Sequence, residues 1–356
     1  MHGDRSRAQG PRHRAGGHGR GRAAAGGSER RGHRAGAGVS GPAAPPPAGP
    51  PSAGAAVRVT VPASSANLGP GFDALGIALA LYDAVHVEVV DGPDGTAEVS
   101  AEGEGAAAIP TDHEHLVVRV LHRTWAELGL PRRAVRLRCR NSIPHSRGLG
   151  SSAAAIVAGV AAAYELAGFA LRDNKNLDQA LHLAAAEEGH ADNVAASLLG
   201  GVVIAWQDGD RFRAASLPAH ADLHPVAFVP AGESATHTTR GLLPAQVPHA
   251  DAAFNAGRAA LAVHALTTDP SLLPAATEDR LHQDYREPAW PATIELVRRL
   301  RAAGVAAAVS GAGPTVLALP PRGELPNSAH STGFTALHLP VDRCGVRVVS
   351  GRSQIE

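Results

Sequence analysis

A glycine-serine stretch carries most of the fold information in this sequence: Pro144-His145-Ser146-Arg147-Gly148-Leu149-Gly150-Ser151-Ser152-Ala153-Ala154. It lies between a predicted strand at residues 134–140, where apolar and basic residues alternate, and a predicted alanine-rich helix at residues 152–167. Glycines let the backbone approach a ligand closely, and the first N–H groups of a helix carry partial positive charge. The stretch therefore predicts an anion site built from backbone amides, although a plain loop with a serine helix cap has a similar composition.

The basic residues restrict how such a site can be built. Of 33 basic side chains only one, Lys175, is lysine, and it stands in Arg-Asp-Asn-Lys-Asn. A Walker A loop needs a lysine after its glycine, and a protein kinase needs one on its third strand. Lys175 fits neither pattern, so both of these nucleotide-binding classes are excluded.

Predicted strands and helices are mixed along the chain, which indicates an α+β protein. Further strands are predicted at residues 57–61, 84–90, 201–206 and 225–230, further helices at 177–188, 251–267 and 291–303, and an apolar run interrupted by glycines at 305–319. At about 150 residues per domain, the 301 residues after residue 55 suit two domains. We place them at 56–210 and 211–356, with the boundary in the 205–225 region.

Residues 1–55 differ in composition from the rest and are predicted to be a disordered, low-complexity extension. Nine arginines against two acids give this segment a charge of +7, and 24 basic against 31 acidic residues give the remainder −7. Fourteen glycines and the Pro-rich residues 41–51 leave almost nothing large and apolar to bury. The segment is either a nucleic-acid-binding arm or an incidental product of GC-rich codons. Its Arg-Ala-Gly-Pro bias favours the second, and the acidic remainder argues against a nucleic-acid partner.

Cysteine usage and hydropathy indicate a cytoplasmic protein without a membrane partner. Cys139 and Cys344 are too few for a disulfide framework or a four-cysteine zinc site. The longest apolar run, residues 153–163, is shorter than the ~20 residues of a bilayer span. No apolar segment follows the basic N-terminus, as a secretory signal would require.

Three further motifs contain candidate binding groups. Residues 62–76 hold three glycines, two prolines, Asn67 and Asp73, and predict a tight loop whose carboxylate binds an ammonium group or caps a following helix. Residues 187–194, at a predicted helix end, offer acidic groups for Mg²⁺ or simply a solvated helix terminus. Residues 304–315, which end in Ser310-Gly311-Ala312-Gly313-Pro314-Thr315, predict a second glycine loop.

Together the four motifs resemble those of the GHMP kinases and, within that superfamily, of the homoserine kinase family. The family's phosphate-loop pattern, Pro-x-x-x-Gly-Leu-Gly-Ser-Ser-Ala, is met by Pro144 and residues 148–153, and residues 64–73 and 188–195 resemble its other signatures. The resemblance covers about residues 57–350. It implies an N-terminal ribosomal-protein-S5-like domain, a C-terminal ferredoxin-like α/β sandwich domain, and a homodimer. It also implies ATP-dependent phosphorylation of the L-homoserine side-chain hydroxyl, with Mg²⁺.

By position, the resemblance implies a role for each motif. The phosphate loop, Pro144 to Ala154, wraps the ATP phosphates. Ser152 and Glu188 hold Mg²⁺, with Glu187 as the alternative acid. The implied substrate-binding residues are Asn67, Asp73, Thr236, Arg240, Arg286 and Gly311. Asp73 takes the substrate ammonium group, and two arginines suit its carboxylate because the planar guanidinium binds carboxylates bidentately. The implied catalytic residues are His190 and Asn193, which flank the reacting hydroxyl, together with Arg240.

Some positions depart from the family pattern. His115 stands where asparagine is frequent, and Ala191 and Ala196 replace common prolines. Because of these departures, the resemblance does not assign the residues that contact adenine. Asn193 cannot act as a base at neutral pH, so we predict transfer by alignment and charge stabilisation without a strong general base. Two alternatives remain: a GHMP kinase for another small alcohol, such as mevalonate or a sugar, and a non-catalytic nucleotide- or amino-acid-binding protein. Asp73, Arg240 and Arg286 favour a zwitterionic substrate.

Overall fold

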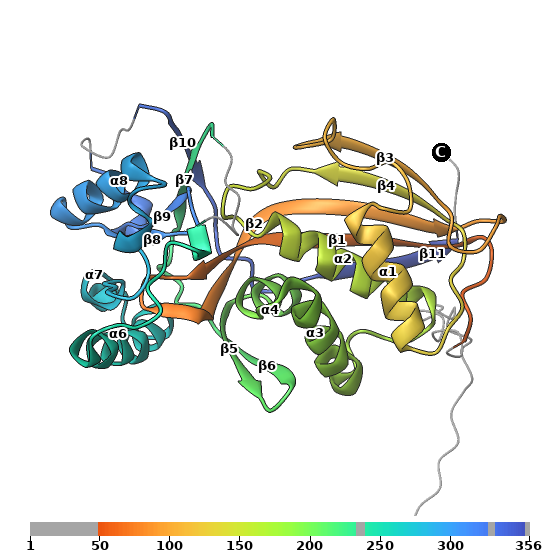
Figure 1. The fold of residues 1–356 in the computed structure, drawn as a ribbon, viewed down its shortest axis with the longest axis horizontal. Helices are drawn as coiled ribbons and strands as arrows, with labels where there is room; N and C mark the ends of the chain where they lie inside the picture. The colour runs from red at the N-terminus through yellow and green to blue at the C-terminus, as the bar shows by residue number, and fades with distance from the viewer. Residues whose placement is uncertain (1–48, 233–238, 327–331, 353–356) are drawn as a thin grey trace, which may run out of the picture. The chain divides into compact units, whose positions relative to one another are not determined.

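A computed structural model describes residues 49–232, 239–326 and 332–352. These residues belong to one compact unit, which contains two β-sheets with helices packed on each (Figure 1). The predicted α+β class is confirmed. Of the predicted extension, residues 1–48 lie outside the described residues, and residues 49–54 lead into the first strand, with the Gly49 N–H donating to the Ala167 carbonyl at 3.0 Å.

The first sheet has the strand order β11-β1-β2-β4-β3, and β5 and β6 extend it from β2. The strands are β1 (Ala55–Asn67), β2 (Gly71–Val89), β3 (Ala97–Gly103), β4 (Val135–Asn141), β5 (Val202–Asp208), β6 (Arg211–Leu217) and β11 (Arg347–Arg352). Among the strand pairs that the structure describes in this sheet, only β3–β4 is parallel. Val57, Val59 and Val61 of β1 are buried and alternate with more exposed residues, as the period-two pattern predicts.

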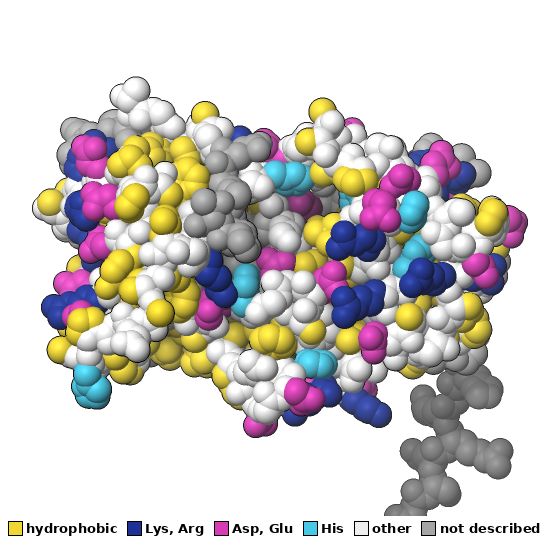
Figure 2. Space-filling view, in the orientation of Figure 1, with side chains coloured by type: hydrophobic (Ala, Val, Ile, Leu, Met, Phe, Trp, Pro, Cys, Tyr) yellow, Lys and Arg dark blue, Asp and Glu magenta, His cyan; other side chains and the backbone are white. Residues whose placement is uncertain are grey.

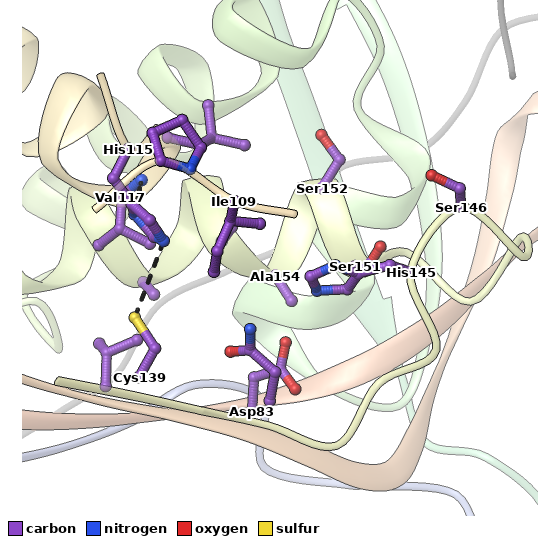
Figure 3. A pocket seen from close by; sticks show the side chains of 16 residues that line it. Asp83, Ile109, His115, Val117, Cys139, His145, Ser146, Ser151, Ser152 and Ala154 are labelled. Atoms are coloured by element: carbon purple, nitrogen blue, oxygen red, sulfur yellow. Dashed lines mark hydrogen bonds between the residues drawn. The ribbon is translucent and has the colours of Figure 1, made fainter. Parts of the chain in front are cut away.

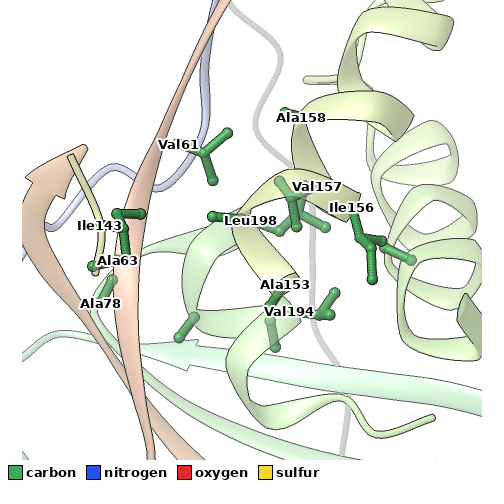
Figure 4. Packing of buried hydrophobic residues seen from close by; sticks show 14 of the residues in the cluster. Val61, Ala63, Ala78, Ile143, Ala153, Ile156, Val157, Ala158, Val194 and Leu198 are labelled. Atoms are coloured by element: carbon green, nitrogen blue, oxygen red, sulfur yellow. The ribbon is translucent and has the colours of Figure 1, made fainter. Parts of the chain in front are cut away.

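Four helices form a layer next to this sheet: α1 (Leu116–Glu127), α2 (Ser151–Leu166), α3 (Asn174–Glu188) and α4 (Asp192–Leu199) (Figure 1). Helices α2 and α4 contact β1 and β2, and α1 and α3 flank α2. The helix α2 is buried on most sides, and its small side chains allow close neighbours. Ala153 and Val157 face β1 and α4 (Figure 4), and a Cβ on Gly159 would lie 2.8 Å from the Val117 carbonyl oxygen of α1.

The second sheet is antiparallel, with the strand order β10-β7-β9-β8. Its strands are β7 (Val226–Pro230), β8 (Ala306–Val309), β9 (Val316–Leu319) and β10 (Phe334–His338), and its helices are α6 (His249–Thr267), α7 (Leu273–Ala276) and α8 (Pro291–Ala302). Short 3₁₀ turns are η1 (Pro270–Leu272), η2 (Asp284–Arg286) and η3 (Pro321–Gly323). Val226 and Phe228 pack in the cluster that contains α8, whereas Ala227 belongs to the cluster that contains Leu266 of α6. Helices therefore cover both faces of this sheet.

The domain division predicted at residue 210 does not coincide with a sheet boundary. It falls inside the β5–β6 hairpin, whose two strands pair over residues 202–217 in the first sheet. The chain enters the second sheet only at Val226, and β11 returns to the first sheet beside β1. Strands that pair in a hairpin stay in one sheet, so the chain leaves the first sheet after residue 217 and not at residue 210.

The tight loop predicted for residues 62–76 is wrong in extent. Strand β1 continues to Asn67 and β2 starts at Gly71, so only residues 68–70 connect them. The small side chains of residues 63–66 are buried in the strand, and register shifts after Pro62 and Ala66 bend it. Asp73 lies in β2 with a φ of 55°, so it caps no helix.

None of the described helices combines the length and apolar character that a bilayer span requires. On the face in Figure 2, acidic and basic side chains are interspersed over the described residues.

Candidate active site

The glycine-serine loop connects β4 to α2 and holds its shape through two glycines in the left-handed region. Gly148 has a φ of 81°, and a Cβ there would collide with the Ser310 carbonyl oxygen. Gly150 has a φ of 70°, and a Cβ there would collide with Ser64 Oγ. Both positions therefore need glycine for conformation and for space, as the sequence predicted.

The N-terminus of α2 opens directly from this loop. Gly150 is the N-cap residue and no side chain caps the helix, which rules out the serine-cap alternative. No capping side chain therefore competes with a ligand for the N–H groups of the first helical turn. The neighbouring Ser152 Oγ donates instead to Glu188 Oε2 at 2.8 Å.

Two pockets meet at the loop and share Ser146, Ser151 and Ser152. The apolar pocket is lined by Val85, Ile109, His115, Val117, Cys139 and Ala158, among others (Figure 3). The polar pocket is lined by Asn67, Asp73, His190, Asn193, Arg240 and Arg286, among others. An elongated ligand with an apolar end and an anionic middle fits this arrangement.

His115 helps to build the wall of the apolar pocket. Its Nδ1 accepts from the Val117 N–H at 3.3 Å, so it caps α1, and its Nε2 lies 4.0 Å from Cys139 Sγ (Figure 3). Burial lowers the pKa of His115 and raises the pKa of the Cys139 thiol to about 12. Both groups are therefore neutral near pH 7 and suit an uncharged ligand.

Asp83 fixes the two residues that directly precede the glycine-serine loop. Its Oδ1 accepts from the Ser142 and Ile143 N–H groups at 2.7 and 2.9 Å. Burial raises the pKa of Asp83 while these two hydrogen bonds oppose the increase. This role of Asp83 could not be predicted from the sequence, because a carboxylate in the middle of a strand belongs to no motif.

Asp73 and Arg240 form an ion pair in the polar pocket, with Arg240 Nη2 2.5 Å from Asp73 Oδ1. Asn67 supports the geometry: its Oδ1 accepts from the Asp73 N–H, and its Nδ2 donates to the Gly311 carbonyl, both at 3.0 Å. Burial raises the pKa of Asp73, and Arg240 opposes this shift. A carboxylate and a guanidinium from distant parts of the chain thus meet in one pocket.

Arg286 also lines the polar pocket and is only 2% exposed. Its Nη1 lies 2.8 Å from His282 Nδ1 and donates to the Gly311 carbonyl at 3.2 Å. Burial and the neighbouring Arg240 lower the pKa of Arg286 to about 10, so it keeps its charge at neutral pH. The Phe72 ring lies 5.7 Å from the Arg240 guanidinium and 5.9 Å from that of Arg286.

His190 and Asn193 lie at the start of α4. His190 Nδ1 lies 3.0 Å from the buried Asp192 Oδ1, and this hydrogen bond raises the pKa of His190 against the effect of burial. Asn193 Oδ1 accepts from Ser64 Oγ at 3.0 Å, which leaves its NH₂ group toward the pocket. Ser64 and Asp192 therefore orient the two predicted catalytic side chains, a function that the sequence analysis missed.

The two candidate acids for the metal differ in position. Glu188 lines the polar pocket beside Ser152, and burial raises its pKa. Glu187 instead pairs with Arg123 at 2.6 Å and Arg119 at 3.6 Å on α1. No group of three His, Cys, Asp or Glu side chains that could hold a metal occurs among the described residues. One carboxylate and one hydroxyl beside a phosphate site nevertheless fit Mg²⁺, which binds few protein ligands together with phosphates and water.

Not every predicted phosphate-loop side chain faces a pocket. Leu149 and Ala153 are fully buried in the core. Arg147 lies against the end of β7, donating to the Pro230 and Ala231 carbonyls at 3.1 and 2.9 Å. The predicted phosphate contacts of these residues are therefore limited to their backbone. Thr236 lies outside the described residues.

Comparisons with known proteins give the family. The GHMP kinases N terminal domain family matches residues 115–201, and the GHMP kinases C terminal family matches residues 261–331. A homoserine kinase of Streptomyces avermitilis is 50% identical over 299 residues, which cover 83% of this chain and 96% of the relative. A homoserine kinase of Streptomyces coelicolor is 54% identical over 267 residues, which cover 74% and 84%.

Solved structures agree. The crystal structure of homoserine kinase from Cytophaga hutchinsonii has a TM-score of 0.72 and 27% identity, and the match covers 83% of this chain and 97% of that one. Mevalonate diphosphate decarboxylase from Staphylococcus aureus, at 15% identity and a TM-score of 0.57, covers 83% and 98% and shares the fold. The matches to both the N-terminal and the C-terminal domain families identify a GHMP kinase. Within that superfamily, the identity over nearly the whole length of its relatives shows that the chain belongs to the homoserine kinase family.

Proposed function

We propose that this protein transfers the γ-phosphoryl group of ATP to the side-chain hydroxyl of L-homoserine. The observation that carries the proposal is the charge set in the polar pocket: one carboxylate, Asp73, and two guanidinium groups, Arg240 and Arg286, next to the phosphate loop. An amino acid zwitterion has the complementary charges, whereas mevalonate and sugars lack the ammonium group.

The nucleotide occupies the apolar pocket and the loop. The adenine ring contacts the neutral wall of the apolar pocket, and the phosphates lie on the amides of residues 148–152, where the α2 dipole favours anions. Ser152 and Glu188 would hold Mg²⁺, which when bound neutralises phosphate charge.

Substrate binding exchanges one ion pair for two. In the absence of substrate, Asp73 and Arg240 neutralise each other at 2.5 Å. The ammonium group replaces the arginine as the partner of Asp73, and the carboxylate replaces the aspartate as the partner of Arg240. Both charged side chains therefore keep a partner, which limits the cost of displacing water from a half-buried site.

Transfer itself depends on alignment. The Asn193 NH₂ group donates to the reacting hydroxyl or to a phosphoryl oxygen, and it cannot accept a proton. The hydrogen bond to Asp192 raises the pKa of His190, which favours the positively charged form of this side chain beside the phosphates. Charge stabilisation without a strong base is sufficient for phosphoryl transfer with a loose transition state.

The test is ADP release from ATP and Mg²⁺ with homoserine, serine, mevalonate or galactose. We expect turnover that depends on homoserine and a much lower kcat/KM for the other three. Asp73→Asn should raise the KM for homoserine at least tenfold with an unchanged KM for ATP, since only the substrate ammonium loses its partner. Preference for mevalonate or galactose would favour the alternative small-alcohol kinase, and absence of turnover on all four would overturn the proposal.

The remaining expectations concern the whole protein. We propose a homodimer located in the cytoplasm, with residues 1–48 dispensable for activity. Light scattering after size-exclusion chromatography measures the mass, and cell fractionation followed by immunoblotting measures the location. A chain starting at residue 49 should keep the kcat and KM of the full chain, and a large loss would give the N-terminal segment a role.

A further inference from the structure

The imidazole of His282 connects the turn between β1 and β2 to Arg286 of η2, a predicted substrate-binding residue. Its side chain is fully buried, its Nε2 lies 2.7 Å from the Gly69 carbonyl oxygen, and its Nδ1 lies 2.8 Å from Arg286 Nη1. A carbonyl only accepts and a guanidinium only donates. These partners therefore fix a neutral imidazole with the proton on Nε2 and the lone pair on Nδ1.

The surroundings hold this imidazole rigidly. Asp279 accepts from the N–H groups of Leu281, His282 and Gln283 at 2.8–3.0 Å, and from Asn255 Nδ2 at 3.0 Å. Gln283 Oε1 accepts from the Val309 N–H at the end of β8. The Phe72 ring stacks on the imidazole at 5.1 Å. The ring is thus fixed from its own turn, from β8 and from β2.

Arg286 has donors left over after this contact. Its Nη1 is used by His282 and Gly311, whereas its Nε is buried and has no hydrogen-bond partner among the described residues. A buried guanidinium nitrogen without an acceptor is costly and indicates a ligand that supplies one. Nε and Nη2 form one edge of the guanidinium, and this edge matches the two oxygens of a carboxylate.

We propose that His282 is a positioning residue: by accepting a hydrogen bond from Nη1 through its Nδ1 lone pair, it turns the Nε–Nη2 edge of Arg286 toward the substrate carboxylate. Gly69 and Asp279 act through it by fixing the tautomer and the position of the ring. This inference rests on the proposed function, because it assigns the carboxylate of the amino acid substrate to that edge.

The chain offers a matched pair of variants. In His282→Asn the amide oxygen takes the place of Nδ1, so the acceptor for Arg286 remains and the donor to Gly69 is lost. In His282→Gln the amide nitrogen takes the place of Nε2, so the donor to Gly69 remains and the acceptor for Arg286 is lost. Each variant removes one buried hydrogen bond, and only the second removes the one to Arg286.

Steady-state kinetics should separate the two. We expect the KM for homoserine to rise less than about threefold in His282→Asn and about tenfold or more in His282→Gln, with the KM for ATP and the kcat within about twofold in both. The analogue 3-aminopropan-1-ol, which is homoserine without its carboxylate, gives a second measurement. His282→Gln should leave kcat/KM for this analogue near the wild-type value and so reduce the preference for homoserine about tenfold or more.

Equal effects of the two variants on the KM for homoserine, or an equal loss with homoserine and with the analogue, would overturn the inference and leave the proposed function intact. A wild-type protein inactive on homoserine would overturn both. If thermal unfolding shows that His282→Gln is not folded, Arg286→Lys replaces it. Lysine can still donate to Nδ1 but lacks the two-nitrogen edge, so the same selective loss is expected, and its absence would contradict the proposal.

Discussion

Ser64 determines which end of the Asn193 amide faces the polar pocket. Its hydroxyl donates to Asn193 Oδ1 at 3.0 Å and is itself 3.2 Å from Ser197 Oγ. Without this contact the amide can rotate and present its oxygen, an acceptor, to the polar pocket. Ser64, which lies outside the lining of the pocket, thus orients the NH₂ group of Asn193 toward the pocket.

Ser64→Ala should therefore lower the kcat about tenfold while the KM for homoserine and for ATP changes little, since the loss is in alignment at the reacting atoms. Ser65→Ala is the matched control: Ser65 is equally buried on the same strand and accepts from Ser310 Oγ at 2.8 Å. Steady-state kinetics and thermal unfolding measure both variants. A kcat loss of the same size in the control would mean that strand packing, and not Asn193, is responsible.

Asn193→Asp tests the absence of a general base directly. A carboxylate there loses the NH₂ donor, meets the buried Asp192 and repels the phosphates, so the kcat should fall at least about tenfold. Asn193→Ala provides the reference for simple loss of the amide. A turnover rate above wild type in the aspartate variant would show that the reaction benefits from a base.

Motifs predicted the local geometry of the glycine-serine loop, because this geometry depends on residues that are neighbours in the chain. Residues 148–152 needed only local geometry, namely two left-handed glycines followed by a helix. The pairing of Asp73 with Arg240, 167 residues apart, depends on how the two sheets meet, which no local pattern records. Which of Glu188 and Glu187 is the candidate metal ligand depends on tertiary contacts as well, because Arg123 of α1 forms an ion pair with Glu187.

At the scale of elements, the loop between β4 and α2 packs so closely against its surroundings that no side chain fits at Gly150. Gly150 and Gly129 have nearly the same φ, 70° and 71°. A Cβ at Gly150 would collide with Ser64 Oγ, whereas nothing lies within 4 Å of one at Gly129. Alanine substitutions at the two glycines therefore separate the free-energy cost of the left-handed conformation from the cost of a steric clash.

Gly129→Ala should cost only the left-handed penalty of about 1–2 kcal/mol and keep the activity. Gly150→Ala should lose about 100-fold or more in kcat/KM, because the loop must move away from Ser64 and the amides of α2 shift with it. Urea unfolding and ATP saturation kinetics measure the two effects. Equal activity in the two variants would contradict a close-packed phosphate loop.

Strands and helices with a clear sequence pattern were predicted, whereas those that depend on tertiary contacts were missed in part or completely. The alternation in residues 134–140 and the alanine-rich run of α2 gave β4 and α2 to within one residue at each end. Strand β2 spans 19 residues but was predicted only at 84–90, because its first half curves through glycines and pairs with β5. Helix α4 has eight residues, too few for a periodic signal, and is defined by its burial against β1.

For the whole molecule, the buried His282 makes stability depend on pH. Burial lowers its pKa to about 4, with Arg286 adding to the decrease, while Asp279 and the Gly69 carbonyl oppose it. Since the unfolded value is near 6.5, the unfolded chain takes up this proton first as the pH falls. The contribution is therefore fully present above pH 6.5 and is lost as the pH falls toward 4.

Between pH 7 and pH 4.5 this one group should cost about 2–3 kcal/mol of the free energy of unfolding. His282→Asn cannot titrate, so its free energy of unfolding should decrease by that much less than the wild type over the same interval. Other titrating groups, such as Asp73 and Glu188, are common to both proteins and cancel in the difference. Urea unfolding at the two pH values measures it, and parallel pH profiles would show that folding does not lower the pKa of His282.

Strand β11 has a consequence for how the protein is made. β1, at residues 55–67, has β2 on one side and β11 on the other, and β11 consists of residues 347–352. During translation the outer edge of β1 keeps its N–H and C=O groups unpaired until β11 has been synthesised, and such an edge is a template for pairing with another chain. A polypeptide that stops before β11 therefore leaves the ribosome with the edge of β1 open, and the first sheet is completed only when β11 joins it.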